Sequence, residues 1–322
     1  MPSNFARTGV LLVMLTGIFV AMGAVVGGKE GMVAAFVIAL ATNAFAYWNS
    51  DTVVLKMFKA QELSPADAPQ LHQLVASLAH RAGLPMPRVY LVPSPQPNAF
   101  ATGRNPSRSA VAVSAGLIDA LDTPELAGVL AHELAHIRNR DTLTMTIAAT
   151  IAGAISMFAN LLQFSFLFGA RRATGRFGWL GALFAILLAP FAAMLVQMAI
   201  SRSREYEADR IGAEMCGNPL WLASALERIH AVARRTPFPE ADMAPAAAHL
   251  FIVNPLTGQG MDNLFTTHPN IENRIAELHK LAAEWRQAGV DAPQPIEIAE
   301  SRPTSTWGEH QSRASGPRGP WS

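Results

Sequence analysis

Four apolar stretches, each about as long as a membrane-spanning helix, constrain the fold of this chain more than any other feature. They cover residues 9–26, 32–47, 143–170 and 179–200. A helix that crosses the hydrocarbon core of a bilayer needs about 20 predominantly apolar residues. Charged residues make up 15% of the chain, against roughly a quarter in ordinary soluble domains. The sequence therefore predicts a mostly α-helical membrane protein with four transmembrane helices; a buried core helix is the alternative for any single stretch.

These stretches divide the chain into five segments. Transmembrane hairpins at residues 8–50 and 143–200 would each return the chain to the side from which it came. The polar blocks 51–142 and 201–292 then lie on one side and are expected to form two halves of one domain. Residues 293–322, rich in Pro, Ser, Gly and Arg without apolar periodicity, are expected to be a disordered tail. A cleavable signal peptide is the alternative for the first stretch, but the second follows so closely that a retained hairpin is favoured.

Basic residues indicate which side of the membrane the polar blocks face. They flank the predicted spans at Lys56, Lys59, Arg138, Arg140, Arg202 and Arg204. By the positive-inside rule this side is the cytoplasm. Arg171, Arg172 and Arg176, in the loop between the third and fourth stretches, oppose this assignment. The sequence leaves open whether those two stretches fully span the membrane.

Charge and cysteine content exclude two kinds of function. The net charge is +1 and no basic run is interleaved with aromatic residues, so there is no reason to expect nucleic acid as a partner. Cys216 is the single cysteine. The chain therefore cannot form an internal disulfide or a CxxC-type zinc or redox site.

The first polar block has the pattern of a small α+β domain. Residues 66–82 carry apolar side chains at helical spacing, and Gly83 then ends the predicted helix. Residues 89–92 and 109–113 are short, β-branched and partly alternating, as strands are. The prolines within residues 93–103 indicate a loop or an edge strand, because proline cannot supply the hydrogen bonds of a central strand.

A strong helix start follows at the end of this block. Asp122 is placed as an N-cap, Pro124 lies in the first turn, and Glu125 can reach back to complete a capping box. Apolar residues then recur at helical spacing: Leu126, Val129, Leu130, Leu134 and Ile137. The sequence therefore predicts one helix with a buried stripe.

Two histidines on the adjoining face of this helix indicate a metal site. His132 and His136 are one turn apart, so both imidazoles can converge on one ion. Glu133 can reach a metal-bound water and act as general base. Neutral imidazoles suit Zn²⁺, and three protein ligands with one water form the catalytic arrangement. The pattern predicts a zinc metalloprotease; the alternative is two histidines on a solvated helix face.

The predicted third ligand lies at the start of the second polar block. Glu205 and Asp209 share one helix face, so Glu205 can bind zinc while Asp209 accepts a hydrogen bond from a ligand imidazole. The alternative is that both pair with neighbouring arginines on a charged surface: Arg202, Arg204 and Arg210. A metzincin is excluded, because His136 is not followed by the glycine and third histidine of that class.

Four segments of the sequence resemble the HtpX family of membrane zinc proteases, which is related to the CAAX prenyl proteases. They are residues 98–103, 132–141, 201–209 and 267–275. With the apolar stretches, the resemblance covers about residues 8–280. It implies one zinc ion per chain in a gluzincin-type α+β metalloprotease domain that is mostly helical and has a small sheet. It also implies a multi-pass protein of the bacterial inner membrane whose catalytic domain faces the cytoplasm.

The resemblance also implies roles for individual residues. Zinc is expected to be held by His132, His136 and Glu205, with Glu133 as the base. An edge that binds the substrate backbone by strand addition is expected at Asn98, Ala99, Phe100 and Ala101.

Two further residues, His268 and Arg274, are expected near the scissile carbonyl, where they would stabilise the oxyanion. The alternative for His268 is a cap before the helix that starts at Pro269. The alternative for Arg274 is a surface ion pair with Glu272 or Glu277.

The substrates implied by the resemblance are unfolded or misassembled membrane proteins, cleaved internally as part of protein quality control. A CAAX-type enzyme acting on prenylated C-termini is one alternative. A non-catalytic, zinc-dependent membrane scaffold is another, and Glu133 argues against it because a purely structural site needs no base.

Overall fold

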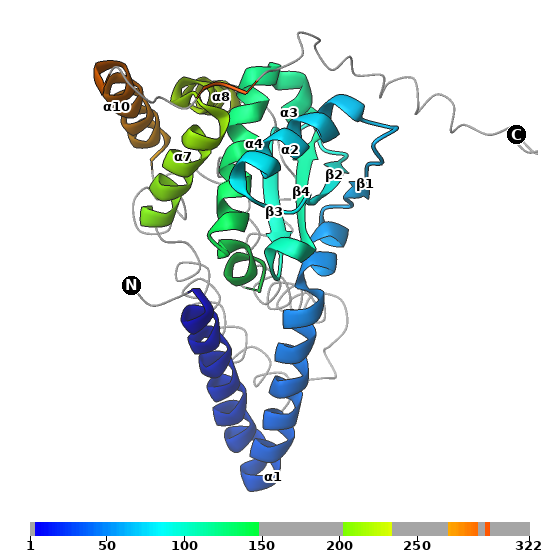
Figure 1. The fold of residues 1–322 in the computed structure, drawn as a ribbon. Helices are drawn as coiled ribbons and strands as arrows, with labels where there is room; N and C mark the ends of the chain where they lie inside the picture. Colours follow the sequence, from blue (N-terminus) through cyan, green and yellow to red (C-terminus); the bar gives the residue numbers. More distant parts are fainter. Residues whose placement is uncertain (1–3, 148–201, 234–269, 289–293, 297–322) are drawn as a thin grey trace, which may run out of the picture.

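The computed structural model describes residues 4–147, 202–233, 270–288 and 294–296 of the chain. A long helical hairpin projects from one end, and the other described elements gather around a small sheet (Figure 1). Helices from both predicted polar blocks pack against one another in this second part. The two blocks are therefore halves of one folded unit.

The hairpin is formed by α1 (Asn4–Met57), which folds back on itself (Figure 1). The reversal lies at Gly28, whose φ of 59° is in the left-handed region that glycine adopts without strain. The two arms touch at Gly23 and Gly31, where a Cβ on Gly23 would lie 2.3 Å from the Gly31 carbonyl oxygen. Only glycine permits so close a crossing.

Within the described residues, one stretch is long and apolar enough to cross a membrane: Gly28–Asn49, in the second arm. Its Phe36, Val37 and Ile38 are 45%, 59% and 55% exposed. An exposed apolar surface of this kind suits contact with lipid. The first predicted stretch lies on the other arm, and the third and fourth lie outside the described residues from residue 148 onward. The set of four spans stays a prediction.

A mixed sheet with strand order β1-β2-β4-β3 lies beside the hairpin. Its strands are β1 (Gln61–Glu62), β2 (Arg88–Val92), β3 (Ala99–Gly103) and β4 (Ser109–Ser114). β2 and β4 are parallel, and the other pairs are antiparallel. The strands predicted at 89–92 and 109–113 are confirmed, and the proline-containing segment supplies the edge strand β3.

The sheet packs against helices on both faces. On one face, the last turns of α1 contribute Val54 and Leu55, which pack with Phe100 and Val92. On the other face, α2 and α4 share a larger core with the sheet. The hairpin is thus joined to the rest of the protein through hydrophobic packing.

The central helix is α4 (Thr123–Arg138). Its predicted capping box is confirmed, because Asp122 accepts from the Glu125 amide while the Glu125 carboxylate accepts from the Asp122 amide. Every residue from Glu125 to Ile137 is buried. This part also contains α2 (Pro69–Ala82), which ends at Gly83 as predicted, α3 (Ala115–Ala120), α7 (Arg202–Cys216), α8 (Pro219–Ala233) and α10 (Ile271–Ala288). A 3-10 turn lies at Pro106–Arg108, and residues 141–147 are helical.

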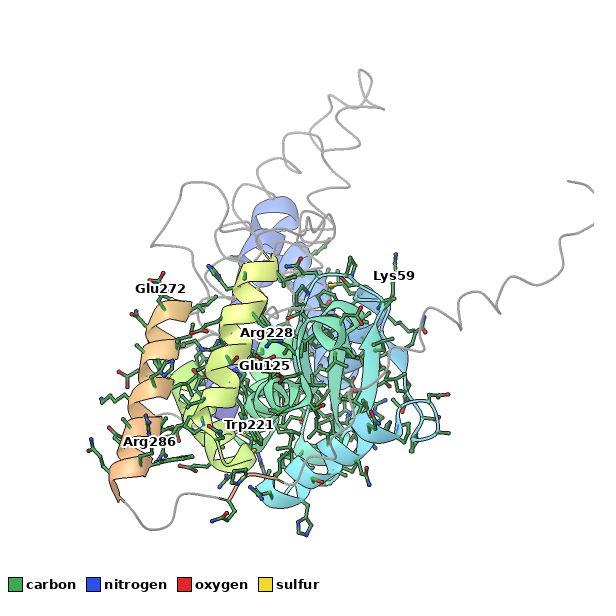
Figure 2. The ribbon with its side chains drawn as sticks, turned by 90° about the horizontal axis from the view of Figure 1, so that it is seen from above. Lys59, Glu125, Trp221, Arg228, Glu272 and Arg286 are labelled. Carbon is green, nitrogen blue, oxygen red and sulfur yellow. The ribbon has the colours of Figure 1, made fainter. Side chains whose placement is uncertain are left out.

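The buried cap of α4 also anchors α8. Glu125 Oε1 accepts a hydrogen bond of 2.5 Å from Ser224 Oγ and lies 3.1 Å from Arg228 Nε. Figure 2 shows Glu125 and Arg228 together between the two helices. Glu125, which completes the capping box of the central helix, therefore also binds the neighbouring helix from the second half of the chain.

The segment 294–296 belongs to the fold, whereas the sequence pattern placed it in a disordered tail. Ile296 is 7% exposed, and its amide donates to the Cys216 carbonyl at 3.2 Å. Arg81 Nη1 donates to the Gln294 carbonyl at 2.5 Å. One buried apolar side chain suffices to dock such a segment, and composition averages do not detect it.

Burial raises the pKa of the Cys216 thiol to about 11, so this thiol stays protonated at neutral pH.

Candidate metal centre

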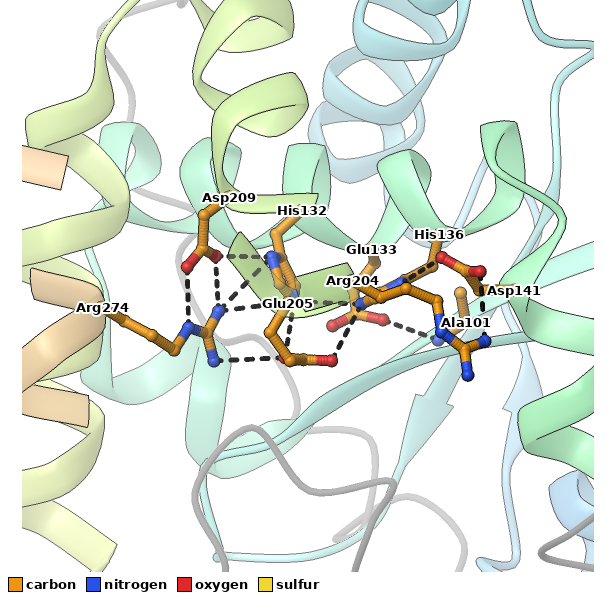
Figure 3. A network of polar contacts seen from close by, with 9 residues as sticks. All are labelled: Ala101, His132, Glu133, His136, Asp141, Arg204, Glu205, Asp209 and Arg274. Atoms are coloured by element: carbon orange, nitrogen blue, oxygen red, sulfur yellow. Dashed lines mark hydrogen bonds and ion pairs between the residues drawn. The ribbon is translucent and has the colours of Figure 1, made fainter. Parts of the chain in front are cut away.

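Two helices bring three potential metal ligands together. His132 and His136 lie one turn apart on α4, and Glu205 lies in the first turn of α7. The two Nε2 atoms are 3.3 Å apart, and the Glu205 oxygens lie 3.7 Å from Nε2 of His132 and 3.6 Å from Nε2 of His136. All three side chains are buried and face one another (Figure 3).

Hydrogen bonds on the far side of each imidazole decide where its proton lies. Nδ1 of His132 is 2.8 Å from Asp209 Oδ1, and Nδ1 of His136 is 3.2 Å from Asp141 Oδ2. A carboxylate only accepts, so each neutral ring carries its proton on Nδ1. Each Nε2 then turns a lone pair toward the other and toward Glu205. Such a buried convergence of electron pairs is unfavourable unless a cation lies among them.

The spacing of these donor atoms fits zinc. Bonds of roughly 2.0–2.2 Å in tetrahedral geometry place neighbouring ligand atoms roughly 3.3–3.6 Å apart. The observed separations are 3.3, 3.6 and 3.7 Å. Two imidazoles and one carboxylate leave a fourth position for water or substrate, as in catalytic zinc sites. His132, His136 and Glu205 can therefore hold one zinc ion.

Glu133 lies beside the three ligands. Its Oε2 accepts a hydrogen bond of 2.9 Å from the Ala101 amide of β3. Burial raises the pKa of the Glu133 carboxyl, and the charges of His132 and His136 oppose this shift. A raised pKa suits a general base, because the carboxylate then accepts a transferred proton more readily.

Behind His132, the buried ion pair of Asp209 and Arg274 joins α7 to α10. Arg274 Nε and Nη2 donate to the two Asp209 oxygens at 2.8 and 2.6 Å, and Nη1 lies 3.5 Å from Glu205 Oε2. Burial alone would raise the pKa of Asp209, but the Arg274 charge and hydrogen bonds hold it below its usual value. Burial alone would lower the pKa of Arg274, but Asp209 raises it. Both groups are therefore charged.

Asp141 is a site residue that the sequence patterns did not identify. Its carboxylate is 1% exposed and lies against Nδ1 of His136. Burial alone would lower the pKa of His136, but the hydrogen bond with Asp141 and the charges of Glu205 and Glu133 raise it to about 9. Without a bound metal ion, a proton on Nε2 would therefore take the place of the cation at neutral pH. The available signal was an acidic residue just beyond the predicted helix. Such a residue reaches back only if the chain turns there, which its position in the sequence does not show.

The contact at Gly212 determines how closely α7 approaches α4. A Cβ added there would lie 2.9 Å from the backbone nitrogen of His132. Glu205, Asp209 and Gly212 recur at helical spacing and so share the face of α7 that meets α4. The absence of a side chain at Gly212 lets this face approach closely enough for Glu205 to meet the imidazoles.

Replacing Gly212 by alanine is expected to weaken zinc binding about tenfold or more, because the methyl group must push α7 away from the α4 backbone. Overpacking of this kind costs about 1–3 kcal/mol. Chelator competition measures the affinity, and thermal unfolding measures the stability. Gly17→Ala on α1, where an added Cβ meets nothing within 4 Å, is the matched control. Wild-type zinc affinity in Gly212→Ala would contradict the prediction.

The remaining predicted site residues lie as follows. Asn98 directly precedes β3, and Ala99, Phe100 and Ala101 are part of this edge strand. The amide of Ala101 points to the catalytic side of the strand, as its bond to Glu133 shows. Arg274 lies within the site, against Asp209 and Glu205. His268 lies outside the described residues.

Two of the alternative interpretations are wrong. Glu205 and Asp209 are 2% and 4% exposed, so they do not lie on a charged surface. Arg210 instead pairs with Glu207 and Glu214. Arg274 is 1% exposed, so its ion pair is not a surface contact.

Comparisons with known proteins cover most of this region. The family model described as peptidase family M48 matches residues 65–282, a range that contains all three potential ligands and Glu133. Among solved structures, the crystal structure of S. mikatae Ste24p is similar, with 19% sequence identity and a TM-score of 0.46. The match covers 85% of this chain and 63% of the S. mikatae chain.

Proposed function

We propose that this chain, which belongs to peptidase family M48, is a membrane-integral zinc endopeptidase of the HtpX type, the family that residues 98–103, 132–141, 201–209 and 267–275 resemble. We propose that it hydrolyses peptide bonds in unfolded or misassembled membrane proteins as part of protein quality control. The observation that carries the proposal is the buried convergence of His132, His136 and Glu205 with Glu133 beside them. A structural zinc site would not need the adjacent carboxylate.

The described side chains account for the steps of hydrolysis. His132, His136 and Glu205 would hold the zinc ion, which when bound polarises the scissile carbonyl and acidifies water. Glu133 would take a proton from the attacking water and pass it to the amine nitrogen as the C–N bond breaks. Asp209 and Asp141 would keep the ligand imidazoles oriented through their Nδ1 protons.

The edge of the sheet supports binding of an extended peptide. β3 pairs with β4 along one side, and its Ala101 amide faces Glu133 on the other. A peptide added along this edge would replace the bond of the Ala101 amide to Glu133 with a backbone hydrogen bond of its own, and backbone pairing tolerates many side chains. The backbone of the bound peptide would then lie next to the Glu133 carboxylate.

The hairpin supports a location at a membrane. Its second arm is long and apolar enough to span, and its large apolar side chains are exposed. Lys56 and Lys59 lie where α1 joins the sheet, which favours a cytoplasmic position for this end. We propose that the protein lies in the bacterial inner membrane with its catalytic part in the cytoplasm.

The substrate class is tested by offering the detergent-purified, zinc-loaded protein two substrates. One is an unfolded membrane protein, and the other is a peptide with a prenylated C-terminus. We expect internal cleavage of the unfolded protein, lost with a zinc chelator and restored by zinc. Cleavage of the prenylated peptide alone would instead establish the CAAX-type alternative.

A further inference from the structure

The imidazole of His136 is backed by a charged pair in the same order as that of His132 (Figure 3). Asp141 Oδ2 lies 3.2 Å from His136 Nδ1. The other carboxylate oxygen, Oδ1, lies 3.3 Å from Arg204 Nη1. Imidazole, carboxylate and guanidinium thus follow one another on both sides of the metal centre, and neither arginine comes from α4.

A tight turn at residues 139 and 140 follows α4 and positions Asp141. Asn139 caps the helix, and Arg140 has a φ of 58°, in the left-handed region. A non-glycine residue rarely adopts this conformation unless its surroundings hold it there. This turn brings the Asp141 carboxylate to the imidazole of His136, which lies within the last turn of α4.

Arg204 comes from the helix that supplies the third ligand. It directly precedes Glu205 on α7, and its side chain reaches Asp141 while Glu205 reaches the two imidazoles. The Arg204 side chain is 12% exposed, and that of Asp141 is 1% exposed. Burial on this scale removes both groups from water, which is unfavourable unless their charges are matched. The ion pair of Arg204 and Asp141 is therefore an internal contact of the fold and not a surface contact.

We propose that Asp141 and Arg204 are positioning residues for the zinc ligand His136. Asp141 keeps the proton on Nδ1 and so leaves the Nε2 lone pair for the metal. Arg204 holds the Asp141 carboxylate in place and couples it to the start of α7, so that one short segment sets both Glu205 and His136. The inference rests on the proposed zinc centre, which it deepens.

The two charged pairs differ in strength. Arg274 donates two hydrogen bonds of 2.8 and 2.6 Å to Asp209, whereas Arg204 Nη1 donates to Asp141 Oδ1 at the longer distance of 3.3 Å. Bidentate arginine–carboxylate pairs are the stronger and more rigid kind. Loss of Arg204 should therefore weaken the site less than loss of Arg274 does.

The test is the zinc affinity of the full-length protein in detergent, measured by chelator competition. Asp141→Asn keeps the shape of the side chain without its charge, and Arg204→Met keeps most of the length of the arginine. Each is expected to weaken zinc binding about 10- to 100-fold, the usual effect of losing such a partner. Arg204→Lys is expected to recover part of the loss. The visible spectrum of the Co²⁺-loaded protein should shift in Asp141→Asn and Arg204→Met, because the orientation of His136 changes.

Arg210→Met is the matched control, since Arg210 lies on the same helix and pairs with Glu207 and Glu214 at the surface. It is expected to keep wild-type affinity and spectrum. Wild-type values in both Asp141→Asn and Arg204→Met would overturn the inference and leave the proposed function standing. A weaker affinity with an unchanged cobalt spectrum and no recovery by lysine would also overturn it, in favour of a purely structural ion pair. A wild-type protein that binds no zinc would overturn the proposed function itself.

Discussion

Replacing Glu133 by glutamine is expected to abolish peptide hydrolysis while zinc stays bound. The amide is nearly the same size as the carboxylate and can still accept the hydrogen bond of the Ala101 amide, but it cannot take a proton from water. General bases contribute about 10²- to 10⁴-fold to rate, so turnover of an unfolded membrane protein should fall by at least that factor. Metal content and proteolysis are measured on the same preparation.

The control for this substitution lies on the same helix. Glu125→Gln changes another buried carboxylate of α4, one that caps the helix and holds Ser224 and Arg228. It is expected to lower stability and to keep activity at temperatures where the protein is folded. Proteolysis that survives Glu133→Gln would rule out the mechanism. A client-binding phenotype that survives without proteolysis would point to the scaffold alternative.

Replacing Arg274 by methionine is expected to destabilise the protein by about 3–5 kcal/mol, because Asp209 is then left as a buried carboxylate without its partner. Zinc affinity should fall as well, since Asp209 orients His132 and Arg274 also neighbours Glu205. Thermal unfolding of the metal-free protein and chelator competition measure the two effects. Arg274→Lys keeps a charge but loses the paired hydrogen bonds. Its stability and zinc affinity are expected to lie between those of Arg274→Met and the wild type.

The effect of Arg274→Met should depend on pH. In the wild type the pKa of Asp209 is held below its usual value, so its contribution to stability is present above about pH 4 and is lost as the pH falls. Without the arginine, burial raises the pKa of Asp209 above the unfolded value. The unfavourable free energy of the buried, unpaired carboxylate disappears when the carboxyl takes up a proton. The stability difference between the two proteins should therefore shrink as the pH falls.

Arg286→Met controls for the loss of an arginine from α10. This side chain is exposed near the end of the helix, where Figure 2 labels it, and it donates to the Ala282 carbonyl. Its replacement is expected to change stability by less than about 0.5 kcal/mol. A loss below about 1 kcal/mol in Arg274→Met, with wild-type zinc affinity, would show that Asp209 does not depend on Arg274.

Much of the local structure around the site could be predicted. The capping box at Asp122 and Glu125 starts α4 at the expected place, and Gly83 ends α2. Strands β2 and β4 were visible as short β-branched runs. β1 was not, because a pair of exposed residues carries no periodicity. The docked segment 294–296 was also missed, since its only apolar anchor is Ile296.

The contacts of the site were less predictable than its ligands. Nothing in the sequence links Glu133 to the Ala101 amide, which lies 32 positions earlier and on another element. The patterns suggested a surface role for Arg204 as a charge beside the membrane, yet its side chain turns inward to Asp141. A charged residue next to an apolar stretch has the same pattern whether it faces headgroups or a buried carboxylate.

The sequence by itself determined the helix that carries His132 and His136 and the face shared by Glu205 and Asp209. Helical hydrogen bonds, caps and one-turn spacing join residues close in the chain, so local order contains this information. Only the tertiary structure decided which carboxylate backs which imidazole. Arg274 stands 65 positions from Asp209, and Arg204 stands 63 positions from Asp141. Contacts of this kind depend on how closely helices pack, and the close approach at Gly212 sets that distance.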